Sequence, residues 1–217
     1  MLTVTLEMKN VIFRLRKNIY HRLNASSRYQ LHSPFLYKLA TEVFSGKANN
    51  ELTNDHQLLE VKSSEHSKIS LKKAQVLSRL LVLIEPKNIL YIGNSEVSTS
   101  IITQASPNSK VILVEDSFDF INVVVANLDE VDTFDFVFYE GEEIQVEKVK
   151  EIFDKCLRYK SNNSVFVFNK IYHTSEMNKA WNYIKNHQET IVSIDLFHMG
   201  IVLFRKEMSR QQIKYRY

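Results

Sequence analysis

The chain has 217 residues, of which 44% are hydrophobic and 24% charged, a composition typical of one soluble globular domain. Its net charge of +3 is too small to indicate a nucleic-acid-binding protein by itself, and no apolar run reaches the ~20 residues of a membrane span. The N-terminus has no signal-peptide pattern, so we expect a cytoplasmic protein. The single cysteine, Cys156, excludes an internal disulfide and is interpreted as a buried, inert thiol.

Glycine is scarce. The sequence contains only 4 glycines, about 2% of its residues, against an average near 7%. A glycine-rich phosphate-binding loop is therefore excluded, and any cofactor must be held by side chains and one tight turn.

Residues 6–23 predict an amphipathic helix. Apolar residues recur at helical spacing, and basic residues occupy the other face. We interpret it as a helix docked on the domain with a solvated basic face, although such a helix can also bind a membrane or a partner. The apolar positions are Met8, Val11, Ile12, Leu15, Ile19 and Leu23, and the basic positions are Lys9, Arg14, Arg16, Lys17 and Arg22.

Two more helices follow before the first strand. Ser33, Pro34 and Gly46 predict the cap, start and stop of a short helix over 34–45. Residues 47–70 are polar and read as a linker or loop. Ser70 then caps a helix that Pro86 closes. We therefore divide the chain into an N-terminal helical region, 1–70, and a second domain, 71–217.

From residue 88 onward the pattern alternates between strands and helices, which predicts a doubly wound parallel sheet. The last two strands are joined across three residues, which is too short for a parallel crossover, so they must be antiparallel. The predicted strands are 88–93, 110–115, 134–140, 164–168, 190–197 and 200–206, and the predicted helices are 95–105, 143–159 and 175–187.

Two motifs carry a resemblance to a known family. "HSPF" at 32–35 and "IDLFHMGIVLFRK" at 194–206 are similar to segments of the Bacteroidetes-type class I S-adenosylmethionine (SAM)-dependent methyltransferases. The resemblance covers about three quarters of the chain. It implies a Rossmann-like class I methyltransferase sheet with a C-terminal antiparallel hairpin.

The resemblance also implies a SAM site, from which this sequence departs. In "ILYIGNSEVSTSII", Tyr91 replaces the family's acid, Gly93 is kept, and the second glycine is replaced by Glu96 or Val97. Family glycines at such a turn let the backbone approach the cofactor. The implied SAM contacts are Gly93 and Ser95 here, Glu115 at the ribose and Asn127 at the adenine. Glu115 reads equally well as a solvated loop acid.

The ends of the later strands also differ from the family. Glu140 retains an acid, whereas Asn169 and Lys170 replace two aspartates that hold a divalent metal in metal-dependent members. Because a lysine opposes a cation, we expect no metal. The candidate catalytic residues are Glu140, Asn169 and His173. His173 can act as a general base or be a surface residue at a helix start.

The middle of the sheet is trimmed. Only residues 116–133 separate the second strand from the next clear strand, where the family has a helix, a strand and another helix. The β-branched run Val123–Val125 favours a strand. A helix over 117–128 is the alternative.

Three functional hypotheses follow. The first is methyl transfer from SAM to an unidentified small molecule or macromolecule. The second is a catalytically inactive relative that serves as a binding or oligomerisation module, favoured by the lost motif residues. The third and weakest is a binder of nucleic acid or anionic membranes that uses the basic first helix and the tail "RKEMSRQQIKYRY".

Overall fold

The structure, a computed structural model, describes residues 2–25, 33–45, 70–114, 132–140 and 146–216. The predicted linker, Glu115, Asn127 and the segment 117–128 lie outside these residues. The described strands form one sheet of seven, in the order β2-β1-β3-β4-β6-β5-β7. The strands are β1 (Asn88–Ile92), β2 (Lys110–Val114), β3 (Phe134–Tyr139), β4 (Lys160–Asn169), β5 (Val192–Asp195), β6 (Met199–Leu203) and β7 (Gln211–Lys214).

The helices confirm the predicted positions to within a few residues. They are α1 (Leu2–Asn24), α2 (Pro34–Lys38), the π-helical η2 (Leu39–Phe44), α4 (Leu71–Ile84), α5 (Glu96–Ala105), α7 (Val146–Cys156), the 3₁₀ turn η5 (Leu157–Tyr159) and α8 (Ser175–Asn186). No helix among them is both long and apolar enough to cross a membrane, within the residues described.

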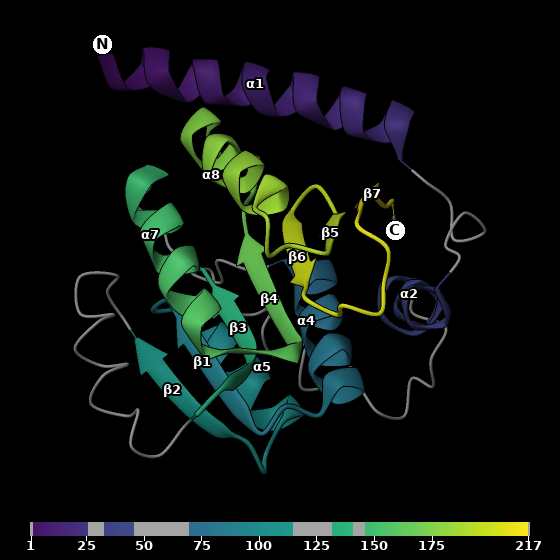
Figure 1. The fold of residues 1–217 in the computed structure, drawn as a ribbon. Helices are drawn as coiled ribbons and strands as arrows, with labels where there is room; N and C mark the ends of the chain where they lie inside the picture. Colours follow the sequence, from purple (N-terminus) through teal and green to yellow (C-terminus); the bar gives the residue numbers. More distant parts are fainter. Residues whose placement is uncertain (1, 26–32, 46–69, 115–131, 141–145, 217) are drawn as a thin grey trace.

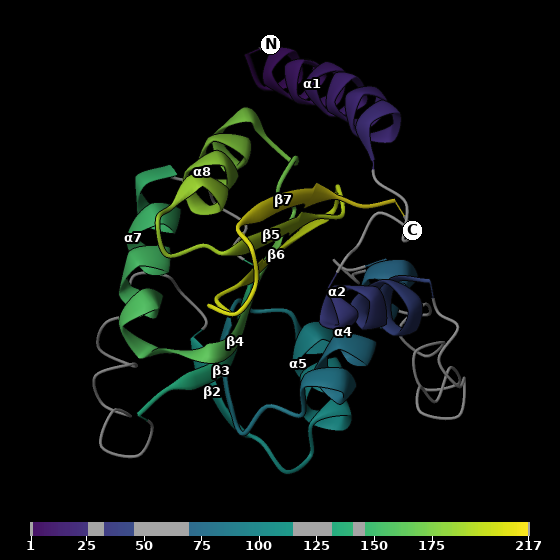
Figure 2. The same cartoon turned by 45° about the vertical axis from the view of Figure 1, so that its right-hand side comes forward.

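Helices cover both faces of the sheet, as Figure 1 and Figure 2 show. Successive strand residues point to opposite faces, so alternate positions of β1 enter different cores. Ile89 and Tyr91 pack with α4, α5 and η2, whereas Leu90 and Ile92 pack with α7 and α8. Because α2 and η2 share the α4 core, the 34–44 segment packs directly on the second predicted domain.

The strand directions confirm a doubly wound parallel sheet with an antiparallel C-terminal hairpin. β1 runs parallel to β2 and β3, and β3 runs parallel to β4. β6 lies antiparallel between β4 and β5. All four parallel strands therefore end at the same edge, where the loops after β1, β3 and β4 meet.

Part of the basic and aromatic tail forms a strand that the sequence did not predict. Residues 211–214 form β7, a seventh strand that pairs in parallel with β5. Tyr215 is buried and its ring lies 5.2 Å from that of Phe44. It cannot stack on a nucleic-acid base without leaving the core.

Helix α1 docks on the domain, but not by the predicted face. Arg14, Lys17 and His21 lie on the side that contacts the domain, while the apolar stripe is exposed to solvent. The apolar periodicity correctly predicted a helix. Lys9, Arg16 and Arg22 are exposed as expected, whereas Arg14 and Lys17 face the domain and the apolar stripe does not.

Candidate functional site

The turn after β1 has the predicted strand–turn–helix form. The Gly93 N–H donates to the carbonyl of Val114 at the end of β2, over 2.9 Å. Ser95 is the N-cap of α5, and its hydroxyl accepts the Ser98 N–H over 3.3 Å. Both residues predicted to contact SAM in this region, Gly93 and Ser95, therefore lie at the carboxyl edge of the sheet.

The structure gives Gly93 a different task from the predicted one. A Cβ at this position would lie 2.9 Å from the hydroxyl oxygen of Tyr91 and 3.0 Å from its ring. The tyrosine side chain folds back beneath the turn, and only glycine leaves room for it. Gly93 is thus explained by a contact within the protein, without any ligand.

Tyr91 is the centre of a buried hydrogen-bond network. Its hydroxyl donates to Oε2 of Glu140 over 2.9 Å and accepts the Ser95 N–H over 3.0 Å. The Asn169 amide donates to Oε1 of the same carboxylate over 2.9 Å. Tyr91, Glu140 and Asn169 are each at most 3% exposed. Both carboxylate oxygens are satisfied by neutral donors, as a buried carboxylate requires.

The alternation of side chains explains why these residues meet. Tyr91 in β1, and Glu140 and Asn169 at the ends of β3 and β4, have the parity of the residues that face α4 and α5. The three strands are neighbours, so their ends bring the three side chains together. Sequence reasoning identified Glu140 and Asn169 as site residues but treated Tyr91 only as a lost acid.

The network lies at the topological switch point of the sheet. The chain leaves β1 toward β2 on one side and returns to β3 on the other. In open α/β sheets, ligands bind at the carboxyl ends of the strands where the order reverses. The Tyr91–Glu140 hydrogen bond spans that position.

The surroundings of the network modify two nearby pKa values. Burial, together with the charge of Glu140, raises the pKa of the Tyr91 hydroxyl well above its usual range. Tyr91 therefore remains a neutral donor at physiological pH. Burial and the neighbouring Lys170 lower the pKa of Lys73 on α4, while Glu140 opposes that shift. Cys156 is buried as predicted, and burial raises its pKa, so it is a poor nucleophile.

His173 stands apart from the network. It is exposed in the loop before α8, and its Nδ1 lies 3.5 Å from the Arg14 guanidinium of α1. Burial of part of the ring, then Arg14 and Lys170, lower its pKa, so the imidazole is neutral at pH 7. That state suits a base, but within the described residues no hydrogen bond joins His173 to Glu140 or Asn169. Its catalytic role stays a prediction.

A second buried cluster, missed in the sequence, holds α1 in place. His21 Nε2 lies 3.2 Å from Oδ1 of Asp195 and 2.9 Å from its backbone oxygen. The Tyr172 hydroxyl donates to Oδ2 of Asp195 over 2.6 Å, and the Phe197 N–H donates to Oδ1. Asp195 belongs to the "IDLF" motif, so the motif marked the position, but spacing alone could not reveal its partner on α1.

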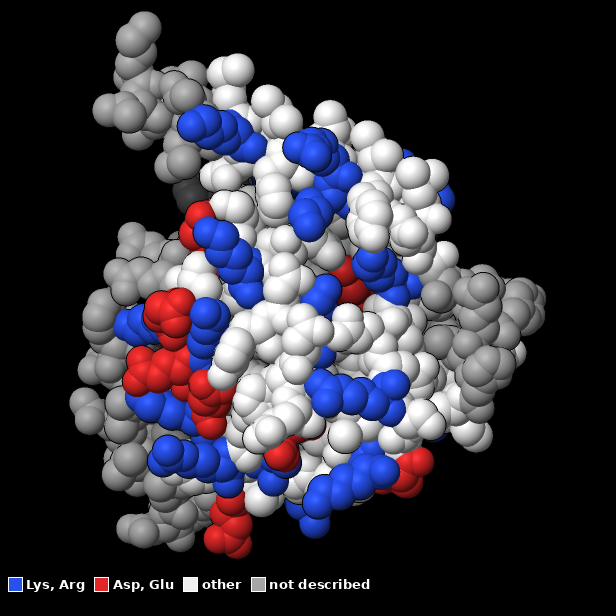
Figure 3. All heavy atoms as spheres, turned by 45° about the horizontal axis from the view of Figure 1, so that its top comes forward, with Lys and Arg blue, Asp and Glu red and all other residues white. Residues whose placement is uncertain are grey.

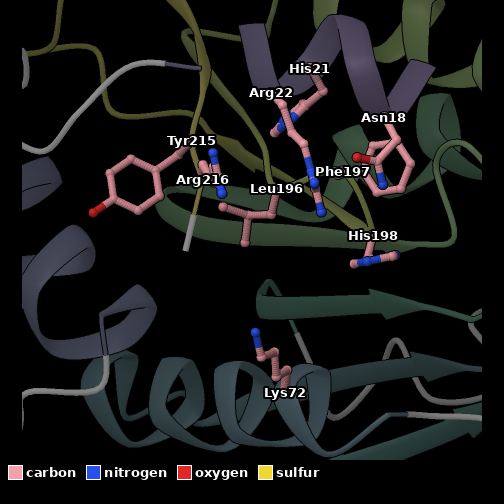
Figure 4. Close-up of a pocket in the computed structure, with 9 residues that line it drawn as sticks. All are labelled: Asn18, His21, Arg22, Lys72, Leu196, Phe197, His198, Tyr215 and Arg216. Carbon is pink, nitrogen blue, oxygen red and sulfur yellow. The ribbon is translucent and has the colours of Figure 1, made fainter. Parts of the chain in front are cut away.

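Beside this cluster lies a basic pocket of about 150 Å³ (Figure 4). It opens between α1, the first turn of α4, the β5–β6 loop and the C-terminal residues. Its lining residues are Asn18, His21, Arg22, Lys72, Leu196, Phe197, His198, Tyr215 and Arg216.

The comparisons with known proteins are structural only. No protein-family model matches the chain, and no curated protein sequence matches it. The cofactor-bound protein Rv0187 from MTB has a TM-score of 0.51 at 13% identity, covering 82% of this chain and 100% of that one. The SAH-bound methyltransferase PaMTH1 of Podospora anserina has a TM-score of 0.50 at 10% identity, covering 87% and 94%. The SAM-bound O-methyltransferase TomG from Streptomyces achromogenes has a TM-score of 0.48 at 13% identity, covering 72% and 90%.

The chain has the class I methyltransferase fold. At such low identities the likeness extends to the fold and no further.

The described groups at the switch point do not fit SAM well. The Ser95 N–H and hydroxyl already have partners, as do both oxygens of Glu140. To recognise SAM here, the protein would need the Ser95 N–H and the Glu140 carboxylate, and both already form hydrogen bonds with Tyr91 or Asn169. In the described part of the chain, no group of three or more histidine, cysteine or acidic residues is placed to hold a metal.

Proposed function

We propose that this protein is a binding module with the methyltransferase fold, in which Tyr91 closes the switch point against SAM. The main support for this proposal is the Tyr91–Glu140–Asn169 network. It converts a ligand-facing edge into part of the core, with each polar atom of the carboxylate paired inside the protein.

Energetics support the closed arrangement. Opening the site would withdraw a donor from a buried carboxylate, and hydrogen bonds to charged groups contribute about 1.5–3 kcal/mol each. A cofactor would have to replace that hydrogen bond and supply a partner for the freed Ser95 N–H. In this proposal, the tyrosine that replaces the family's acid stabilises the fold and removes the capacity to bind SAM.

A titration with S-adenosylhomocysteine (SAH) and SAM tests this proposal. We expect no binding at millimolar ligand to the folded protein. A Tyr91→Phe variant removes only the hydroxyl. The aromatic ring stays beneath the Gly93 turn and still fills the site, so this variant should also fail to bind. Micromolar binding to the wild type would contradict the proposal.

Methyl transfer from SAM to an acceptor is the second candidate. It is favoured by the retained turn, in which Gly93 closes onto β2 and Ser95 starts α5 at the carboxyl edge. In this reading Glu115 and Asn127 would contact the ribose and adenine, and Glu140, Asn169 and His173 would face the acceptor. SAM would supply an electrophilic methyl group, and these residues would orient the acceptor or take its proton.

A Glu115→Ala variant separates the two candidates. If the protein is a methyltransferase, SAH binding should fall at least tenfold in this variant, because the ribose would lose its acceptor. If the switch point is closed, calorimetric titration with SAH should detect no binding to either the wild type or the variant.

A further inference from the structure

The basic pocket beside the His21–Asp195 cluster carries an unassigned binding site. Arg22 reaches down from α1 and Lys72 reaches up from α4 toward the same opening, with His198 between them (Figure 4). Arg216 lines the pocket from the C-terminal residues. Three elements distant in sequence thus bring three permanent cations to a small cavity.

The charge of this pocket is uncompensated among the described residues that line it. None of its nine lining residues is acidic, and Arg22, Lys72 and Arg216 form no ion pair with an acid in the described part of the chain. Asp195 beside the pocket is buried and already paired with His21 and Tyr172. Burial and then Lys73, His21 and Lys72 lower the pKa of His198, which agrees with a cationic environment.

We propose that this pocket binds an anionic group of a small molecule, a phosphate or a carboxylate. Arg22 and Arg216 offer planar guanidinium donors, Lys72 offers a point charge, and Asn18 adds a neutral amide. Phe197, which is partly exposed, provides apolar surface beside the cations. The proposal gives the binding module a ligand class, and it stands whether or not SAM binds.

Calorimetric titration with pyrophosphate, and in parallel with citrate, at low ionic strength tests the site. The variant is Lys72→Gln combined with Arg216→Gln. The matched control is Lys179→Gln, an exposed lysine on α8 whose side chain is 70% exposed. We expect at least a tenfold loss of affinity in the double variant and little change in the control.

The two anions distinguish a phosphate site from a carboxylate site. Absence of binding for both, or an equal loss in Lys179→Gln, would overturn the proposal. SAH titration of the same samples reports separately on the switch point, so failure of one proposal is distinguishable from failure of the other.

A separate observation concerns the outward face of α1. Six large apolar side chains form one stripe along this helix, and each is 53–80% exposed. Helix α1 runs along the top of the molecule (Figure 1). The stripe lies opposite the residues of the helix that contact the domain. Its members are Met8, Val11, Ile12, Leu15, Ile19 and Leu23. Monomeric proteins seldom expose so much contiguous apolar surface without a partner.

The charges beside the stripe are mostly positive, which favours an anionic partner. Lys9 and Arg16 are exposed on α1, and Glu7 is the one exposed acid among the described side chains of this helix. Figure 3 shows blue side chains spread over the face that carries α1, with most of the red gathered to one side. A second copy would bring like charges together, whereas an anionic surface complements them.

We infer that α1 lies on an anionic lipid surface, with its apolar stripe in the headgroup boundary. The His21–Asp195 contact keeps the domain attached to the helix. The exposed stripe explains why α1 docks by its polar side.

Co-sedimentation with phosphatidylcholine vesicles, with and without phosphatidylglycerol, tests this inference. We expect binding only to the anionic vesicles, weakened by salt. Leu15→Glu should abolish binding, because it places a negative charge in the middle of the apolar stripe. The fold should be unaffected, because the Leu15 side chain faces solvent. Leu113→Glu on β2, another exposed leucine, should retain it. Absence of vesicle binding, or a dimer in solution that Leu15→Glu dissociates, would overturn the inference.

Discussion

The Tyr91 hydroxyl and the Glu140 carboxylate meet over 2.9 Å across the ends of β1 and β3. This hydrogen bond occupies the position at which an open α/β sheet presents a ligand. It joins Glu140, which the sequence identified as a candidate catalytic residue, to Tyr91, which the sequence identified only as a departure from the family's acid. Because both side chains are buried, their hydrogen bond stabilises the fold at the edge of the sheet.

Removal of the Tyr91 hydroxyl should destabilise the fold. Tyr91→Phe leaves Glu140 with one donor fewer and the Ser95 N–H without its acceptor, so we expect a loss of about 1.5–3 kcal/mol in the free energy of unfolding. Urea denaturation measures it. Tyr139→Phe is the matched control, since the hydroxyl of this buried tyrosine forms no hydrogen bond with the described residues. Equal losses in both variants would remove the special role of the Tyr91 hydroxyl.

Asn169 should not tolerate conversion to the family's aspartate. Asn169→Asp replaces the amide donor with a second carboxylate beside Glu140, and like charges in one buried site raise a carboxyl pKa. The resulting cost grows as pH rises above the unfolded value of about 4. We expect a loss of roughly 1–3 kcal/mol at pH 8 and less at pH 4.5. Denaturation curves at the two pH values that show no difference would contradict this.

The order of elements from residue 71 onward was accessible to sequence reasoning because apolar periodicity and caps are local signals. The helix predicted over 95–105 and the antiparallel β5–β6 pair were both confirmed. β7 was missed because its sequence is mostly polar and only Ile213 within it is buried. Periodicity also reveals which face of α1 is apolar, but not which face contacts the protein.

The site was harder to predict than the fold. Strand ends identified Glu140 and Asn169, since parallel strands end at one edge. The direction of the Tyr91 side chain, and its reach back under Gly93, depends on packing between three strands. No spacing rule contains that information. The same applies to His21, which is 174 residues from Asp195 in the chain.

The His21–Asp195 contact should make docking of α1 depend on pH. Burial would lower the pKa of His21, but the hydrogen bonds and charge of Asp195 outweigh it and raise the pKa above 6.5. The stabilisation is therefore fully present below pH 6.5 and is lost as pH rises through the folded pKa. The difference in Tm between wild type and His21→Gln should be largest at acidic pH and shrink at alkaline pH.

His173 provides the control of opposite sign. Its pKa is lowered in the folded protein, so protonation disfavours the fold. His173→Gln should therefore gain stability relative to wild type as pH falls. A parallel response of the two variants would contradict the assignment of His21 to a buried ion pair.

Gly200 should be intolerant of a side chain for a packing reason. A Cβ there would lie 2.6 Å from two ring atoms of Trp181, which is fully buried. Gly200→Ala should cost about 1–3 kcal/mol of stability. In the Trp181→Phe background the same change should cost less, because the smaller ring leaves space. Additive losses in this double-mutant cycle would show that the two residues do not compete for one volume.

The most direct test of the closed switch point is calorimetric titration of the folded wild-type protein with SAH. The Tyr91–Glu140–Asn169 network predicts no binding heat up to millimolar ligand, with circular dichroism confirming that the protein is folded. A dissociation constant in the micromolar range would contradict the closed switch point and restore methyl transfer as the first candidate.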